Sequence, residues 1–205
     1  MTEVTKIAII GAPGSGKSDL ANEIGPQLGG TWTLCDDYAE RACDEVDYVP
    51  GFNGGYISHL AVALKRIGIE RSSPDFHIVT CGTLLETSVY AAMDLEVQEN
   101  YASELEYQTV IRRTEAVMKT LAVLFNDEFD YDYFFYLPNR QTDDKWVTFD
   151  KNLQAAWGAF FLVPVIPLLN NDLEQNAKDA LSIIKKEISV EDYRERQRDT
   201  AAATE

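Results

Sequence analysis

The chain has 205 residues, of which 45% are hydrophobic and 25% charged, as in one ordinary globular domain with a sizeable core. Its formal net charge of −16 repels phosphodiester backbones. This charge argues against binding of long nucleic acid and leaves open only a strand end that enters a pocket. The longest apolar stretch, residues 158–169, contains two prolines and is too short to span a bilayer, so we expect no membrane partner.

The first residues and the cysteines indicate the cellular compartment that we expect for the protein. The first residues show no signal-peptide pattern, from which we expect a cytoplasmic protein. Cys35, Cys43 and Cys81 are scattered without the spacing of a zinc site, which predicts reduced thiols. Residues 1–188 are expected to form one domain, and residues 189–205 a charged helix with a disordered tail that catalysis does not need. The oligomeric state stays open, and a homodimer is compatible with the sequence.

Predicted strands and helices alternate along the chain. Residues 6–10 are a continuous apolar run typical of a buried parallel strand. A helix is expected to begin at about residue 17 and to end near Gly25-Pro26 or near Gly29-Gly30. Four more strands are predicted at residues 31–35, 76–81, 131–137 and 162–168, with a long helix at about 103–125. The alternation predicts an α/β fold with a mostly parallel five-stranded sheet flanked by helices, and a ligand site at the carboxyl ends of the strands.

A Walker A phosphate loop follows the first strand and opens the first helix. Its eight residues are Gly11, Ala12, Pro13, Gly14, Ser15, Gly16, Lys17 and Ser18. The glycines allow successive backbone amides to face phosphate oxygens, and the helix adds the positive end of its dipole. Lys17 is expected to contact the β and γ phosphates of a nucleoside triphosphate, and the Ser18 hydroxyl to bind Mg²⁺.

The loop pattern GxPGSGKS, with Pro13 in third place, resembles that of small P-loop kinases, including adenylate kinases and polynucleotide 5′-kinases. The resemblance implies a P-loop NTPase fold with kinase-like topology. The guanine-recognition pattern Asn-Lys-x-Asp of GTPases is missing after the fourth predicted strand, so ATP is the expected nucleotide.

Two carboxylates, Asp36 and Asp37, end the second predicted strand beside the phosphate loop. An aspartate there can orient an acceptor hydroxyl and accept its proton, although capping of the next helix also explains one. The following Tyr38 completes a DDY turn similar to those of polynucleotide 5′-kinases and of nicotinamide riboside and uridine kinases. The resemblance implies that Asp36 is the general base. The arginine that follows DDY in polynucleotide kinases is absent here, since Ala39 takes its place. Arg41 comes two residues later and is the candidate in this turn to bind the acceptor.

The third predicted strand resembles that of uridine and riboside kinases, in which a glutamate ends the strand. Cys81 stands in its place here, which keeps open a degenerate or purely binding function. Glu86, about a turn further on, can reach the waters around magnesium; a solvated residue or a helix cap is the alternative.

Four further arginine and lysine residues are candidates for the acceptor and the transferred phosphate. In related kinases, the long helix that carries Arg112 and Arg113 edges the acceptor pocket, although pairing with nearby glutamates also explains these arginines. The segment after the fourth strand takes the place of a lid, with Arg140 and Lys145 as candidates to close over the phosphates.

These residues favour an ATP-dependent kinase that acts on a nucleoside, a nucleotide or a related small metabolite. Lys17, Asp36 and Arg140 are its expected catalytic residues. One alternative is a kinase of polynucleotide ends or modified DNA, which the DDY turn favours and the acidic charge disfavours. The other is a nonkinase NTPase or a nucleotide-binding regulatory module, which Cys81 favours.

Overall fold

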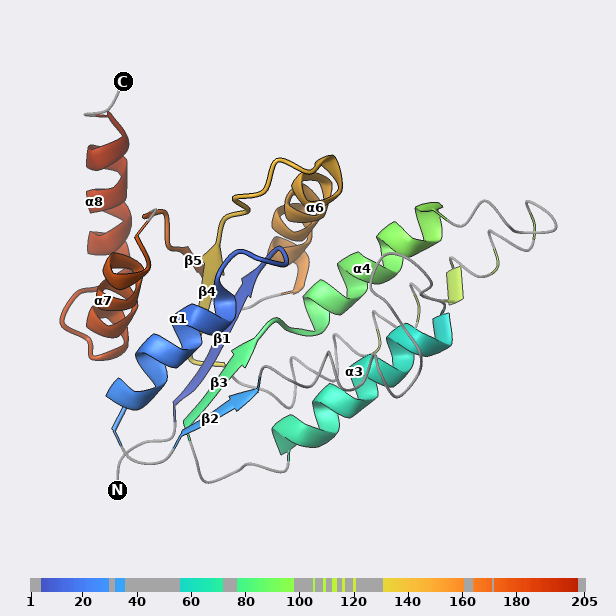
Figure 1. Ribbon diagram of the computed structural model, residues 1–205, viewed down its shortest axis with the longest axis horizontal. Helices are drawn as coiled ribbons and strands as arrows, with labels where there is room; N and C mark the ends of the chain where they lie inside the picture. The colour runs from blue at the N-terminus through green and yellow to red at the C-terminus, as the bar shows by residue number, and fades with distance from the viewer. Residues whose placement is uncertain are drawn as a thin grey trace.

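The computed structural model describes residues 5–29, 32–35, 56–71, 77–97, 131–160, 164–170 and 172–202, and six single positions between 105 and 120. Figure 1 shows a central sheet with α7 and α8 to its left and α3 and α4 to its right. No helix among the described residues has both the length and the apolar character needed to cross a membrane.

All paired strands of the sheet are parallel, and their order is β2-β3-β1-β4-β5. The strands are β1 (Lys6–Gly11), β2 (Trp32–Cys35), β3 (His77–Cys81), β4 (Tyr133–Leu137) and β5 (Val165–Pro167). The predicted α/β class with a parallel sheet flanked by helices is confirmed. From β1 the chain runs toward the edge of the sheet that β2 forms. From β3 it passes β1 and continues to β4, toward the opposite edge. A crevice forms outside the carboxyl ends of the strands at such a switch point, and β1 leads into it.

Six α-helices and one short 3₁₀ helix are described. They are α1 (Lys17–Ile24), η1 (Gly25–Gln27), α3 (Tyr56–Arg71), α4 (Leu84–Val97), α6 (Asp144–Phe160), α7 (Leu173–Ile184) and α8 (Val190–Ala202). Helix α1 begins and ends where the sequence predicts. Of the long helix expected at 103–125, the six described positions are helical.

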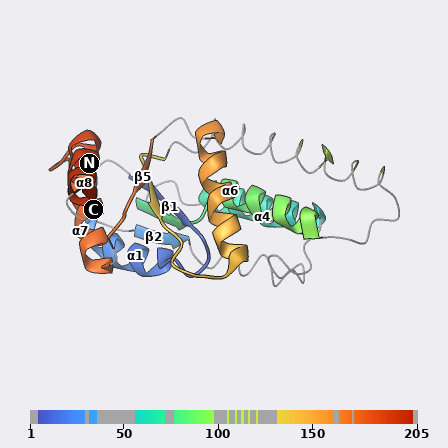
Figure 2. The same cartoon turned by 90° about the horizontal axis from the view of Figure 1, so that it is seen from above.

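The side chains of β1 alternate between two hydrophobic cores because successive residues of a strand point to opposite faces. Ile7 and Ile9 pack with residues of α1, α7 and α8 on one face. Ala8 packs with α3 and α4 on the other face, and Ile10 with α4 and α6. Figure 2 shows α6 and α4 together on the opposite side of the molecule from α7 and α8. With both faces covered, β1 is held rigidly and fixes the position of the loop that follows it.

Helix α8 packs on the domain through one face, although its sequence is strongly charged. Tyr193 is 3% exposed and belongs to the core that contains Ile7 and Ile9. Its hydroxyl donates to the carbonyl of Pro167 (3.1 Å), and Arg194 Nη2 donates to the carbonyl of Val165 (3.2 Å). These bonds cover carbonyls of the edge strand β5, so the helix has a structural role that its composition does not indicate.

Candidate phosphate-binding site

The loop between β1 and α1 depends on two glycines with left-handed backbone conformations. Gly14 has φ 74°, and Gly16, the N-cap of α1, has φ 92°. Residues with a Cβ rarely adopt these backbone conformations. The conformations turn the backbone sharply enough to bring several N–H groups to one side. The loop closes on itself where the Ser15 N–H donates to the Ala12 carbonyl (3.2 Å).

Gly11 lies where two parts of the chain come close together. A Cβ at this position would come within 2.4 Å of the Leu137 carbonyl oxygen at the end of β4 and within 2.8 Å of Ser15 Oγ. Ser15 Oγ is itself buried without a hydrogen-bond partner. The end of β1 is therefore pressed against β4, which holds the first half of the loop in place.

Lys17 begins α1 and turns its ammonium back over the loop. Nζ donates to the carbonyls of Gly11 (2.7 Å) and Ala12 (3.0 Å) and lies 3.6 Å from Glu86 Oε1. Its side chain is 16% exposed. The sequence predicts a positive charge here, and the structure adds that a buried carboxylate accompanies it.

Glu86 is 5% exposed and stands in the first turn of α4. Its Oε2 accepts from the Thr83 N–H (2.6 Å), while Thr83 Oγ1 accepts from the Leu85 N–H (3.2 Å). This reciprocal pattern is a capping box, and the spacing Thr-x-x-Glu announces it in the sequence. Oε1 accepts from the Gly11 N–H (3.2 Å). The capping alternative is therefore the one that the structure describes, while the predicted magnesium contact stays a prediction.

Gln141, which is not among the residues predicted for the site, contacts the phosphate loop from the predicted lid segment. Its Nε2 donates to the Pro13 carbonyl (2.6 Å), and a Cβ on Gly14 would come within 2.3 Å of the same atom. The side chain of Asn139 folds the segment, since its Oδ1 accepts from the Gln141 N–H (3.0 Å). An amide side chain in a polar loop gives no sequence signal for such a contact.

The two basic residues predicted for the lid take other contacts. Arg140 is exposed, and its Nη2 donates to the Asn170 carbonyl (2.8 Å) in the segment that follows β5. Lys145 Nζ lies 4.9 Å from the centre of the Trp146 ring. Arg140 thus ties two loops together at the carboxyl edge of the sheet, and its predicted role at the phosphates stays a prediction.

Five further residues are predicted for the acceptor. Asp36, Asp37 and Arg41 lie outside the described residues. Arg112 and Arg113 are exposed at helical positions. Within the described ranges, no three histidine, cysteine or acidic side chains cluster in a way that could hold a metal ion.

A second polar cluster, in which Tyr136 and Asp150 are buried and Gln154 is exposed, joins β4 to α6. The Tyr136 hydroxyl donates to Asp150 Oδ2 (2.6 Å), and Gln154 Nε2 donates to both the Tyr136 hydroxyl (2.7 Å) and Asp150 Oδ2 (2.9 Å). Burial, and then the neighbouring Asp150, raise the pKa of the Tyr136 hydroxyl. Tyr136 therefore stays neutral and fixes α6 against the strand that lies beside β1.

Similar folds occur among solved structures, while no protein-family model and no curated protein matches the sequence. NadR in complex with NR matches 89% of this chain and 50% of its own, with a TM-score of 0.65 and 13% identity. NadR in complex with NAD and AMP-PNP matches 87% and 49%, with a TM-score of 0.62 and 15% identity. Deoxyadenosine kinase from M. mycoides with bound dATP matches 88% and 100%, with a TM-score of 0.59 and 19% identity.

The chain has the fold of P-loop kinases, as its resemblance to that superfamily implies. It spans about half the length of the NadR chains and the whole length of the deoxyadenosine kinase.

Proposed function

We propose that the protein is an ATP-dependent phosphotransferase whose acceptor is a nucleoside, a nucleotide or a related small metabolite. The observation that carries the proposal is the loop at residues 11–18, which has left-handed glycines, Lys17 and a helix start at the carboxyl end of β1. The fold of the chain is similar to that of a deoxyadenosine kinase with bound dATP and of NadR in complex with NR. Such neighbours support a nucleoside-like acceptor.

The phosphate loop and Lys17 bind the triphosphate in this proposal. Backbone N–H groups of the loop donate to phosphate oxygens, and the Lys17 ammonium neutralises charge on the β and γ phosphates. Ser18 offers a partly exposed hydroxyl at the start of α1. This single hard oxygen fits Mg²⁺, which takes most of its ligands from phosphates and water, and the bound ion supplies neutralisation of the transferring phosphoryl group.

Asp36 accepts the proton of the acceptor hydroxyl in this proposal, and Asp37 supports it. Arg41, Arg112 and Arg113 are assigned to the acceptor, and Arg140 to the charge that develops in the transition state. The bond between Arg140 and the Asn170 carbonyl keeps that arginine at the edge of the sheet where the phosphate loop lies.

A regulatory nucleotide-binding module is the second candidate, because Cys81 ends β3 where related kinases have an acid. Its side chain is buried, at 6% exposed, and supplies no carboxylate to the site. Such a module binds ATP without transferring its phosphate to an acceptor.

A transfer screen with γ-labelled ATP separates these candidates. The acceptors are ribonucleosides, deoxynucleosides, nucleotides, nicotinamide riboside and 5′-hydroxyl DNA ends. We expect the protein to label one small-molecule class. Lys17→Ala should reduce transfer by about 100-fold or more, because the positive charge that neutralises the transferring phosphate is lost. Labelling of DNA ends alone would instead favour a polynucleotide kinase. ATP binding without any labelled acceptor would favour the regulatory module.

A further inference from the structure

We propose that Glu86 is a positioning residue that holds the Lys17 ammonium in place and ties the start of α4 to the phosphate loop. The inference rests on the proposed nucleotide binding at this loop. It gives Glu86 a different role from the magnesium contact that the sequence predicts, and the two roles have opposite consequences for binding.

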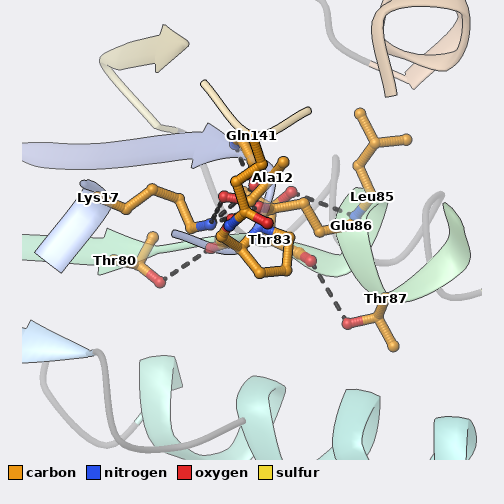
Figure 3. A network of polar contacts seen from close by, with 11 residues as sticks. Ala12, Lys17, Thr80, Thr83, Leu85, Glu86, Thr87 and Gln141 are labelled. Carbon is orange, nitrogen blue, oxygen red and sulfur yellow. Dashed lines mark hydrogen bonds and ion pairs between the residues drawn. The ribbon is translucent and has the colours of Figure 1, made fainter. Parts of the chain in front are cut away.

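One carboxylate meets three separate parts of the chain, as Figure 3 shows. Oε2 accepts from the Thr83 N–H at the start of α4, and Oε1 accepts from the Gly11 N–H at the end of β1. The same Oε1 lies 3.6 Å from Nζ of Lys17 at the start of α1. The three elements are therefore linked through one side chain.

The capping of α4 does not by itself require these contacts. A capping box needs one acceptor oxygen on the side chain at its third helical position, and glutamine supplies it as well as glutamate. Oε1 is free of that task and faces the phosphate loop. A carboxylate that is 5% exposed is costly to bury unless a cation and hydrogen-bond donors compensate it. Lys17 and the two backbone N–H groups provide this compensation, so the negative charge belongs to the loop.

The charge of Glu86 affects a bound triphosphate in two ways. It attracts the Lys17 ammonium and keeps it over the carbonyls of Gly11 and Ala12, which fixes its direction of approach. It also repels the phosphates, because both anions share one cation in a water-poor site. Glu86 thus weakens nucleotide binding while it orients Lys17.

Glu86→Gln tests this balance, since it keeps the shape and the capping oxygen but removes the charge. We expect the full-length variant to bind ATP and inorganic tripolyphosphate about tenfold more tightly than the parent in excess EDTA, as measured by calorimetry, because one buried repulsion is gone. A magnesium contact predicts the reverse: unchanged affinity in EDTA and weaker binding only with Mg²⁺. The matched control is Glu174→Gln on α7, which removes an exposed glutamate paired with Lys178 (2.7 Å) and should leave both affinities unchanged.

Each outcome decides between the roles. Unchanged or weaker binding of the folded Glu86→Gln variant in EDTA overturns the positioning role and leaves the proposed function standing. Failure of the parent to bind either ligand overturns the proposed function as well. Should the variant not fold, amide exchange of the parent decides: tripolyphosphate in EDTA should slow exchange at Gly11 and Thr83, and unchanged rates overturn the inference.

Discussion

Alanine substitutions at Gly11 and Gly14 test the geometry of the phosphate loop, with Gly29 outside the loop as the comparison; all three glycines have positive φ. Gly29 has φ 77° and open space around it, so alanine there adds conformational strain alone. A Cβ on Gly14 also meets the end of the Gln141 side chain. A Cβ on Gly11 meets the backbone carbonyl of Leu137 at 2.4 Å.

The expected effects follow from what each new methyl group meets. Gly29→Ala should cost about 1 kcal/mol of stability, the penalty of a left-handed Cβ, and leave ATP affinity unchanged. Gly14→Ala should lower the stability by about 1 kcal/mol more than Gly29→Ala does, because Gln141 must also give up its bond to the Pro13 carbonyl. Gly11→Ala should reduce ATP affinity by about 100-fold, roughly 3 kcal/mol, because the β4 carbonyl cannot move without disturbing the β1–β4 pairing and the loop must shift instead.

Urea denaturation followed by circular dichroism gives the stabilities, and calorimetric titration with ATP gives the affinities. Addition of Gln141→Ala to Gly14→Ala removes the clash but not the backbone strain. The double variant should therefore be about 1 kcal/mol less stable than the single variant Gln141→Ala and bind ATP with nearly the same affinity. Equal ATP affinity for Gly11→Ala and Gly29→Ala would refute the argument, because the Leu137 contact would then have no bearing on the loop.

Three further predictions concern the acceptor site, α8 and the cluster on β4. Asp36→Asn should leave ATP affinity within a few fold and reduce transfer to an identified acceptor by about 100-fold or more, with a smaller loss for Asp37→Asn; near-parental transfer would remove Asp36 from the mechanism. Truncation after Ser189 removes the buried Tyr193 and should lower the stability by at least about 3 kcal/mol, or Tm by roughly 6–12 °C. Tyr193→Phe removes only the hydroxyl and should cost about 1 kcal/mol. An unchanged melting curve of the truncated chain would contradict the observed packing. Folding raises the pKa of Tyr136 above its ordinary value of 10.0, so the unfolded chain loses this proton at lower pH than the folded chain. The free energy of unfolding should therefore fall as the pH rises above 10. Tyr136→Phe should make this fall less steep, and an identical slope would exclude Tyr136 as its source.

The sequence predicted well those features that short stretches of chain decide for themselves. The phosphate loop was readable because its glycines, Lys17 and Ser18 form a local pattern between an apolar strand and a helix. Helix α1 ends at Gly25 and Pro26, the first of its two predicted interruptions. The Thr83–Glu86 spacing also fits a capping box, although a helix cap was only an alternative for Glu86 in the sequence-based prediction.

Features that depend on contacts between distant segments could not be predicted in this way. The contact of Gln141 with Pro13 joins residues 128 positions apart, and neither residue type indicates it. The charged composition of α8 indicated an expendable helix, yet its position in the fold buries Tyr193. A strongly charged helix still needs only one apolar face to pack, and composition alone does not show which residue occupies that face.

Glu86 makes both kinds of contact, one that local sequence determines and one that depends on the tertiary structure. Its bond to the Thr83 N–H spans three positions, and local spacing determines it. Its bond to the Gly11 N–H spans 75 positions and exists because β3 pairs beside β1, so that the start of α4 lies against the end of β1. The sequence by itself determined that the chain carries a phosphate loop and a capped helix. The strand order of the sheet decided that they share one buried carboxylate, because pairing between strands brings together residues that no local pattern connects.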